Sequence, residues 1–293
     1  MAIKRPADKP SRTLQGRYLA VYSPCHWHRF KAAHPRTLVA PTSNMNKQPA
    51  YTVIGTYLST FTRTITLGLQ HKGIQYTHVP TYPHIAFSAH PLGYVPGLVI
   101  HAQHEGEEDI NLCESQAIVR YIDRVAPEPS LHLIPGKGAV LDEKMWEFVS
   151  LAGSFGLPII QGNIVMARVK ALIGGLKEEQ ILEKLNAGPI AEMQRFLEAT
   201  EKLMAPEGYI FGDKVTWADY FLYPLMANLK TTPEWGLVSE RQKRWTDMME
   251  LQPEAQATTE GTLAAGAQID MVQWGQMDAN LTPIFYVRVY NMP

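Results

Sequence analysis

The feature that most constrains the fold is a proline directly before an apolar strand, in the hexapeptide GYVPGL at residues 93–98. Proline has no backbone N–H, and it makes a cis peptide accessible at only about 0.5–1 kcal/mol over trans. With a cis bond between Val95 and Pro96, the chain would turn sharply before an apolar strand at Leu98–Ile100. The N–H and C=O of Val95 would then form a short edge that can pair with an extended peptide.

A second feature follows at Glu114 and Ser115, where a turn enters a helix. A serine hydroxyl and unpaired backbone N–H groups at a helix N-terminus bind carboxylates well. The peptide-pairing edge and this carboxylate site together indicate a small acidic peptide as ligand. The helix itself is predicted from apolar residues at i, i+3, i+4 and i+7, namely Ile118, Tyr121, Ile122 and Val125.

The segment 51–125 has the pattern of one small domain. An amphipathic helix with Phe61, Ile65 and Leu69 on one face is expected to end at Gly73. Because this helix joins the first two strands, those strands should be parallel. The predicted strands are 51–57, 74–79, 98–101 and 110–112, and a helix starts at Ser115 after them. This β-α-β-(loop)-β-β-α order is that of a thioredoxin-like domain.

The remainder is interpreted as a linker at 126–138, an all-helical domain at 139–262 and a tail at 263–293 to which no role is assigned. The clearest local signal is a capping box at Thr216 and Asp219, in which each side chain accepts the backbone N–H of the other residue. It predicts a helix start in the core of the helical domain. We expect Asp219→Ala to cost about 1 kcal/mol of stability through the lost cap.

The composition is that of an ordinary globular protein, with 45% hydrophobic residues and a net charge of −1. Cys25 and Cys113 form no disulfide framework or CxxC pair, and the histidines lack metal-ligand spacing, so we expect no metal. No run of eighteen uninterrupted apolar residues occurs, so no membrane span is expected. Residues 1–50 carry nine Lys or Arg against one acid. We interpret them as a disordered extension; a mitochondrial transit peptide or a start codon placed too early are the alternatives.

These motifs together resemble the glutathione S-transferase family. In that family the residue before a cis-proline pairs with the cysteinyl backbone of glutathione, and an acid-Ser pair holds its γ-glutamyl end. The segment 212–219 also matches the Gly-x-x-Ser/Thr-x-Ala-Asp capping motif of the family's helical domain. The resemblance covers about 51–262. It implies an α+β two-domain fold, with a thioredoxin-like glutathione-binding domain followed by an all-helical domain.

The resemblance also implies a hydroxyl that stabilises the glutathione thiolate where the first strand enters the first helix. Residues 59–63 (STFTR) resemble the Ser-Pro-Phe-Ser-Arg stretch of serine-type, fungal or bacterial-like cytosolic members, so Ser59 is the first candidate. Thr60, which stands where proline is common, and Tyr57 are the alternates. A plain helix N-cap is the competing interpretation of Ser59. No cysteine lies near position 59, which disfavours the cysteine-type members.

The binding residues follow from the same resemblance. Val95, next to Pro96, would pair with the cysteinyl backbone, and Glu114 and Ser115 would hold the γ-glutamyl group. The HPLG run at 90–93 departs from the commoner Asn-Pro-x-Gly of the family. Candidates for the glycyl carboxylate are His84, His90 and Gln103. Candidates for a second-substrate pocket are Trp146, Phe148 and Phe155, with a place in the hydrophobic core as the competing interpretation of these aromatics.

The function implied is transfer of glutathione, as co-substrate, to a hydrophobic electrophile in detoxification or a biosynthetic step. Isomerisation, ether cleavage and dehalogenation are possible on such a site as well. The competing class is a non-catalytic module of the same fold, as on elongation factor gamma subunits or fungal regulatory proteins. A cytoplasmic homodimer is expected by resemblance, with neither nucleic acid nor membrane as a partner.

Overall fold

The computed structural model describes residues 50–83, 85–133 and 141–267. All but the last residue of the 1–50 segment, and all but the first residues of the 263–293 tail, fall outside the described residues, so the expectations for them stay predictions. Lys47–Pro293 forms one compact unit, and the description below concerns this unit alone.

The N-terminal part is a four-stranded mixed sheet in the order β2-β1-β3-β4. The strands are β1 (Tyr51–Ile54), β2 (Thr77–Val79), β3 (Gly97–Ile100) and β4 (Ile110–Cys113). β1 pairs in parallel with β2 and antiparallel with β3, which is antiparallel to β4. The predicted order of strands and helices is confirmed, although β1 and β2 are shorter than predicted.

Helix α1 (Thr60–His71) begins and ends where the sequence predicts. The backbone N–H of Gly73, at φ +65°, donates to the carbonyl of Gln70, and that of Ile74 donates to the carbonyl of Leu69. These are the two hydrogen bonds of a Schellman motif, which needs a left-handed residue at the position of Gly73. The glycine therefore ends the helix and turns the chain toward β2.

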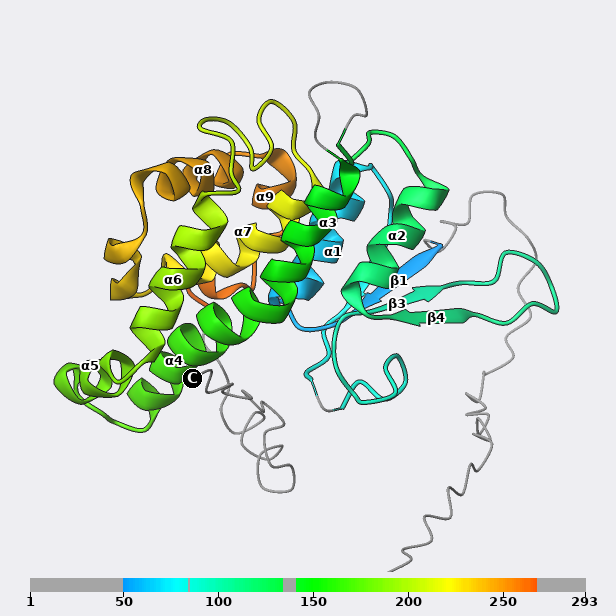
Figure 1. Cartoon of the computed structure of the whole chain (residues 1–293). Helices are drawn as coiled ribbons and strands as arrows, with labels where there is room; N and C mark the ends of the chain where they lie inside the picture. Colours follow the sequence, from blue (N-terminus) through cyan, green and yellow to red (C-terminus); the bar gives the residue numbers. More distant parts are fainter. Residues whose placement is uncertain (1–49, 84, 134–140, 268–293) are drawn as a thin grey trace, which may run out of the picture. The chain divides into compact units, whose positions relative to one another are not determined.

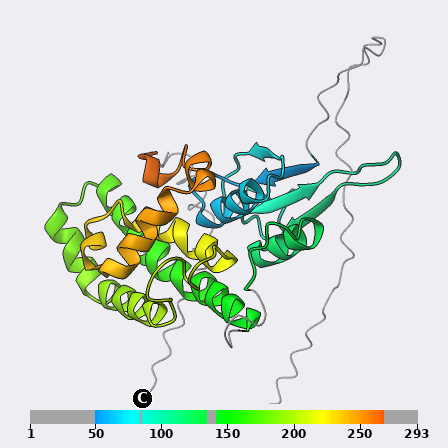
Figure 2. The same ribbon diagram turned by 90° about the horizontal axis from the view of Figure 1, so that it is seen from above.

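Most of α1 is buried, and not only the predicted face with Ile65 and Leu69. One side packs against β1 and α2 (Ser115–Val125), and the other against α7 (Trp217–Leu229) and α9 (Pro253–Ala257). Gly68 makes the close approach to α7 possible, since a side-chain carbon there would lie 2.1 Å from the Trp217 ring. Figures 1 and 2 show α1 between the sheet and the helical part.

The elements of the chain beyond residue 141 are all helices in its described part, joined by loops (Figure 1). Besides α7 and α9, its elements are α3 (Asp142–Leu151), η1 (Ala152–Met166), α4 (Ala167–Ile173), α5 (Glu178–Asn186), α6 (Pro189–Glu201), η2 (Pro233–Leu237), α8 (Glu240–Glu250) and η3 (Leu263–Ala265). The last of these, η3, lies in the described part of the 263–293 tail. Thr262 caps η3 by accepting from the N–H of Ala265, and Leu263 is buried.

α3, η1 and α4 form one helical run of 32 residues, Asp142–Ile173, whose middle part η1 is a π-helix. Pro158 lies inside η1, where it removes a backbone donor. By length and composition this run could cross a membrane, and a core helix of a globular protein passes the same test. The run packs against α6 and α7. The expectation that the protein has no membrane partner stays a prediction.

The capping box at the start of α7 is confirmed, but Asp219 does more than cap the helix. Its carboxylate is completely buried. One oxygen accepts from the N–H and the hydroxyl of Thr216, at 2.8 and 2.9 Å. The other accepts from the N–H of Ile210 and the indole N–H of Trp245, at 2.8 and 2.9 Å. The carboxylate therefore connects α8 with the loop that precedes α7. The predicted cost of about 1 kcal/mol of stability for removing it is too small.

A second polar cluster is centred on His132 in the linker. Its Nε2 lies 2.7 Å from Asp123 on α2, and its Nδ1 lies 2.9 Å from Asp142 on α3. A carboxylate only accepts hydrogen bonds, so both ring nitrogens donate and the ring is an imidazolium. Asp123 also accepts from the Trp217 indole at 2.6 Å and lies 3.1 Å from the Lys72 ammonium. The cluster thus connects α1, α2, the linker, α3 and α7.

The His132 cluster predicts a pH-dependent stability. The hydrogen bond to Asp123 raises the pKa of His132 to about 9, from 6.5. This contribution to stability is present in full below pH 6.5 and is lost as the pH rises through 9, because between these values the folded state retains a proton that the unfolded state has already released. Allowing for a ring that is one-third exposed, we expect a loss of about 2 kcal/mol across this window.

Chemical denaturation at a series of pH values between 6 and 9.5 measures this loss, with His132→Gln as the comparison. The variant should be less stable than the wild type at pH 6. Its free energy of unfolding should not show the decrease between pH 6.5 and 9 that we expect for the wild type. If the free energy of unfolding changed equally with pH in the two proteins, the cluster would not hold the proton.

Candidate functional site

Three chain segments converge at one edge of the sheet. Ile54, Gly97 and Cys113 lie in one row across β1, β3 and β4. Because neighbouring strands in this row are antiparallel, the chain leaves β1, enters β3 and leaves β4 at the same edge. The β1–α1 loop, the Val95–Pro96 step and the start of α2 are therefore brought together (Figure 1).

Ser59 is the N-cap of α1. Its Oγ accepts from the N–H of Thr62 at 3.2 Å, and the residue is half-buried. This geometry is the plain cap that competes with a catalytic interpretation, but it leaves the hydroxyl proton free to be donated elsewhere. The positive end of α1 lies at the same place. A thiolate beside Ser59 would receive both the hydrogen bond and the helix dipole.

The two alternate hydroxyls are placed differently. Thr60 is buried, with 4% of its surface exposed, in the first turn of α1. Tyr57 is 41% exposed and packs edge-to-face against His78, with the ring centroids 4.3 Å apart. Of the three candidates, Ser59 alone combines partial exposure with a position at the helix start.

The Val95–Pro96 peptide is cis. Val95 is half-buried, and the next residue but one, Gly97, pairs with Ile54 at the end of β1. Ser115 is buried as the first residue of α2. These residues lie at the edge where the resemblance requires them, and their contacts with glutathione stay predictions.

Glu114 has an unusual backbone. Its φ of +67° is the one positive value among the non-glycine residues that the structure describes. Its side chain is 76% exposed, and its Oε1 accepts a hydrogen bond from Nε2 of His90 at 3.1 Å. His90 therefore faces the γ-glutamyl end of the predicted site, which corrects its assignment as a candidate for the glycyl carboxylate.

The other candidates for the glycyl carboxylate are Gln103 and His84. Gln103 lies in the loop that joins β3 to β4, and this loop is at the opposite edge of the sheet from Gly97. Its side-chain amide donates to the carbonyl of His101. The assignment of Gln103 to the site is therefore wrong. The predicted site lies at the start of β3, and the hairpin loop lies one strand length away from it. His84 lies outside the described residues.

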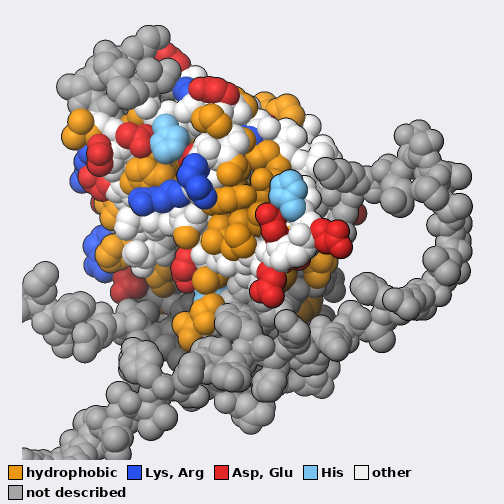
Figure 3. All heavy atoms as spheres, turned by 90° about the vertical axis from the view of Figure 1, so that its right-hand side faces the viewer, with side chains coloured by type: hydrophobic (Ala, Val, Ile, Leu, Met, Phe, Trp, Pro, Cys, Tyr) orange, Lys and Arg blue, Asp and Glu red, His pale blue; other side chains and the backbone are white. Residues whose placement is uncertain are grey.

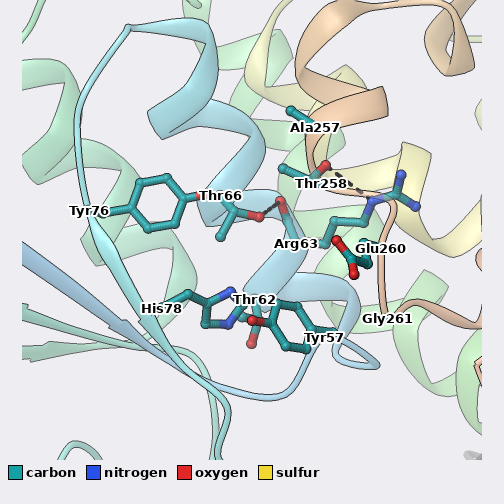
Figure 4. Close-up of a pocket in the computed structure, with 10 residues that line it drawn as sticks. All are labelled: Tyr57, Thr62, Arg63, Thr66, Tyr76, His78, Ala257, Thr258, Glu260 and Gly261. Carbon is teal, nitrogen blue, oxygen red and sulfur yellow. Dashed lines mark hydrogen bonds between the residues drawn. The ribbon is translucent and has the colours of Figure 1, made fainter.

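A cavity of about 400 Å³ opens beside the β1–α1 loop, between α1, β2 and the segment that follows α9 (Figure 4). It does not contain the predicted glutathione residues, but Tyr57 is part of its wall. Gly261, at φ +75°, lets the chain pass close to Tyr57, since a side-chain carbon there would lie 3.0 Å from it. The lining residues are Tyr57, Thr62, Arg63, Thr66, Tyr76, His78, Ala257, Thr258, Glu260 and Gly261.

The side chain of Arg63 extends from this cavity wall into the helical part. It is 4% exposed, and its Nη2 donates to the carbonyl of Ala255 at 3.1 Å and to the hydroxyl of Thr259 at 2.8 Å. Its guanidinium also lies 4.9 Å from the centre of the Tyr223 ring. Burial lowers the pKa of Arg63. This side chain joins α1 to α7 and α9, a role that no local pattern in the sequence indicates.

The predicted second-substrate residues do not gather in one place. Phe148 is completely buried and packs against Phe211, so it belongs to the core and the assignment is wrong. Trp146 lies under the guanidinium of Arg120, with its indole N–H donating to Asp142. Phe155 is 55% exposed on η1.

The start of η1, rather than α3, approaches the predicted glutathione residues. A side-chain carbon at Gly153 would lie 3.9 Å from both Phe61 and Gln116. Phe61 follows Ser59 by two residues, and Gln116 follows Ser115 directly. The described residues include no group of three His, Cys, Asp or Glu that could hold a metal ion.

A thioredoxin-like sheet with a cis-proline before β3, followed by a helical domain that packs on α1, defines the glutathione-transferase class of fold. Comparison with family models agrees. Residues 53–130 match the N-terminal domain of glutathione S-transferases, and residues 187–247 match the C-terminal domain. The chain thus carries both domains of the glutathione S-transferase family. Its assignment to the serine-type members stays a prediction.

Solved structures show the same fold. Glutathione transferase F7 from Populus trichocarpa is 22% identical, with a TM-score of 0.56 over 72% of this chain and 98% of that one. Glutathione S-transferase III in its apo form is 25% identical, with a TM-score of 0.55 over 71% and 94%. The transferase URE2P8 from Phanerochaete chrysosporium, solved with oxidized glutathione, is 16% identical, with a TM-score of 0.55 over 73% and 95%. No curated protein sequence matches the chain.

Proposed function

We propose that this protein is a glutathione transferase in which Ser59 stabilises the thiolate of bound glutathione for attack on an electrophilic carbon. The observation that carries the proposal is the convergence of Ser59, the cis Val95–Pro96 step and Ser115 at one edge of the sheet. In this site Val95 pairs with the cysteinyl backbone, and Glu114 and Ser115 hold the γ-glutamyl end. The oxidized glutathione in the structure of the Phanerochaete chrysosporium transferase supports glutathione as the ligand.

The chemistry requires a modest amount of energy. Lowering the thiol pKa by roughly two units corresponds to about 2.7 kcal/mol of preference for the thiolate. A hydrogen bond to a charged acceptor contributes about 1.5–3 kcal/mol, and a helix N-terminus about 0.3–1 kcal/mol. Ser59 at the first turn of α1 offers both to one sulfur atom, so no metal is needed for the activation.

We place the electrophile between the β1–α1 loop and the start of η1, where Gly153 approaches Phe61 and Gln116. Phe155 follows Gly153 by two residues on the same helix, so the two do not share a face, and a role for Phe155 in the pocket stays a prediction. The reaction would serve detoxification or a biosynthetic step, and isomerisation, ether cleavage or dehalogenation would use the same thiolate.

We also propose that the protein is a cytoplasmic homodimer. Figure 3 views the side of the molecule that carries β4 and α2, where hydrophobic side chains gather in a central area with charged side chains around it. Exposed apolar residues on these elements include Ile110 and Val125. A second copy that covers this area would bury apolar surface that is otherwise in contact with water.

The decisive measurement is the ultraviolet absorbance of the glutathione thiolate in the protein complex as a function of pH. We expect the thiol to titrate roughly two units below free glutathione, the shift assumed above. Glutathione that binds with an ordinary thiol pKa would contradict the catalytic role. Absence of binding would support the competing interpretation, a scaffold of the same fold that acts through protein partners.

A further inference from the structure

We propose that His90 is a positioning residue for glutathione, which aims the carboxylate of Glu114 at the ammonium group of the γ-glutamyl moiety. This inference rests on the proposed function, since it assigns a role within the same site. At position 90 the resemblance leads us to expect asparagine. The roles proposed so far for the site residues give none to a histidine at this position.

The ring of His90 is held rigidly. The residue is 5% exposed, and its ring packs edge-to-face against Tyr94 with the centroids 5.6 Å apart. Its backbone N–H donates to the carbonyl of Ala86, and its own carbonyl accepts from the N–H of Gly93. The ring therefore has a fixed place in the turn that leads to the cis Val95–Pro96 step.

The hydrogen bonds of His90 also determine its tautomer. Nδ1 accepts from the backbone N–H of Leu92 at 3.0 Å, so it carries no proton. In a neutral imidazole the proton must then be on Nε2, which lies 3.1 Å from Oε1 of Glu114. His90 donates a directed hydrogen bond to this carboxylate and contributes no positive charge to it.

Glu114 needs such a partner. Its backbone adopts φ +67°, a conformation that costs of order 1–3 kcal/mol for a residue with a side chain and that tends to occur at functional sites. Its side chain is 76% exposed, so without a partner the carboxylate would sample several rotamers. The bond from His90 holds Oε1 and leaves Oε2 to accept from the γ-glutamyl ammonium of glutathione.

Two substitutions separate this role from a purely structural one. In His90→Asn the side-chain oxygen can still accept from the N–H of Leu92, as asparagine does in turns, but the side chain is too short to reach Glu114. In His90→Gln the longer amide can still donate to Glu114, but it no longer offers an acceptor to Leu92. The first variant removes the positioning bond, and the second removes the turn bond.

The test is calorimetric titration of the full-length wild type and both variants with glutathione and with an analogue that lacks the α-amino group. We expect His90→Asn to keep its stability and to bind glutathione about tenfold more weakly, equivalent to about 1.4 kcal/mol. We expect the analogue to bind the wild type and His90→Asn equally. His90→Gln should bind glutathione nearly as well as the wild type, even where it is less stable.

Equal glutathione affinities for the wild type and His90→Asn would overturn the inference and leave the proposed function intact. A loss of the same size for glutathione and for the analogue would also overturn it, because a distorted turn affects both ligands. Failure of the wild type to bind glutathione at all would overturn both the inference and the proposed function.

Discussion

Asp219→Ala should lower the free energy of unfolding by about 3–5 kcal/mol. The substitution removes the acceptor of four hydrogen bonds, two from Thr216, one from Ile210 and one from Trp245. All four are buried, and each buried donor left without a partner costs about 1–3 kcal/mol. These costs are not additive, because the donors share one carboxylate and relax together, so the total lies below their sum.

Chemical denaturation of Asp219→Ala and of the matched control Asp213→Ala measures this effect. Asp213 lies six residues earlier, in the loop before α7, and is exposed, so its replacement should change stability by less than about 0.5 kcal/mol. At low denaturant the folded fraction of Asp219→Ala should still bind glutathione with wild-type affinity. A variant as stable as Asp213→Ala would show that the buried network contributes little.

Ser59→Ala should reduce turnover with glutathione about tenfold to hundredfold while the protein stays folded. The hydroxyl is one of two groups that lower the thiol pKa, and its share of the roughly 2.7 kcal/mol estimated above is the larger. The thiol of bound glutathione should correspondingly titrate closer to its free value. Loss of the cap to Thr62 should cost about 1 kcal/mol of stability as well.

Ser59→Gly and Ser59→Thr separate the cap from the chemistry. Glycine is nearly as good an N-cap as serine, so Ser59→Gly should keep most of the stability and lose as much turnover as Ser59→Ala. Ser59→Thr keeps a hydroxyl and should retain part of the activity. Unchanged turnover in Ser59→Ala would move the role to Thr60 or Tyr57, which Thr60→Val and Tyr57→Phe then distinguish.

Much of the fold follows from short-range patterns, and these predictions are confirmed. The end of α1 at Gly73 and the capping box at Thr216 depend on hydrogen bonds between residues a few positions apart. The parallel pairing of β1 with β2 follows from the helix between them. Such features are visible in the sequence because both partners lie within one turn or one crossover.

The candidate site is only partly predictable for the same reason. Ser59, Val95 and Ser115 were recognisable because each begins or precedes a helix or strand. Gln103 and Phe148 were assigned wrongly because the hairpin direction and the depth of α3 in the core depend on distant segments. The bond from His90 to Glu114 spans 24 positions and leaves no periodic signal.

The sequence alone therefore determined the order of strands and helices in the N-terminal part, the end of α1, the starts of α2 and α7, and the chemical types of the residues at the predicted glutathione site. The tertiary structure decided which faces are buried and which side chains meet. Arg63 reaches Ala255 and Thr259, nearly two hundred positions away, and Gly68 admits Trp217 against α1. Local propensity acts between neighbours in the chain, whereas such packing depends on the position of the whole helical domain.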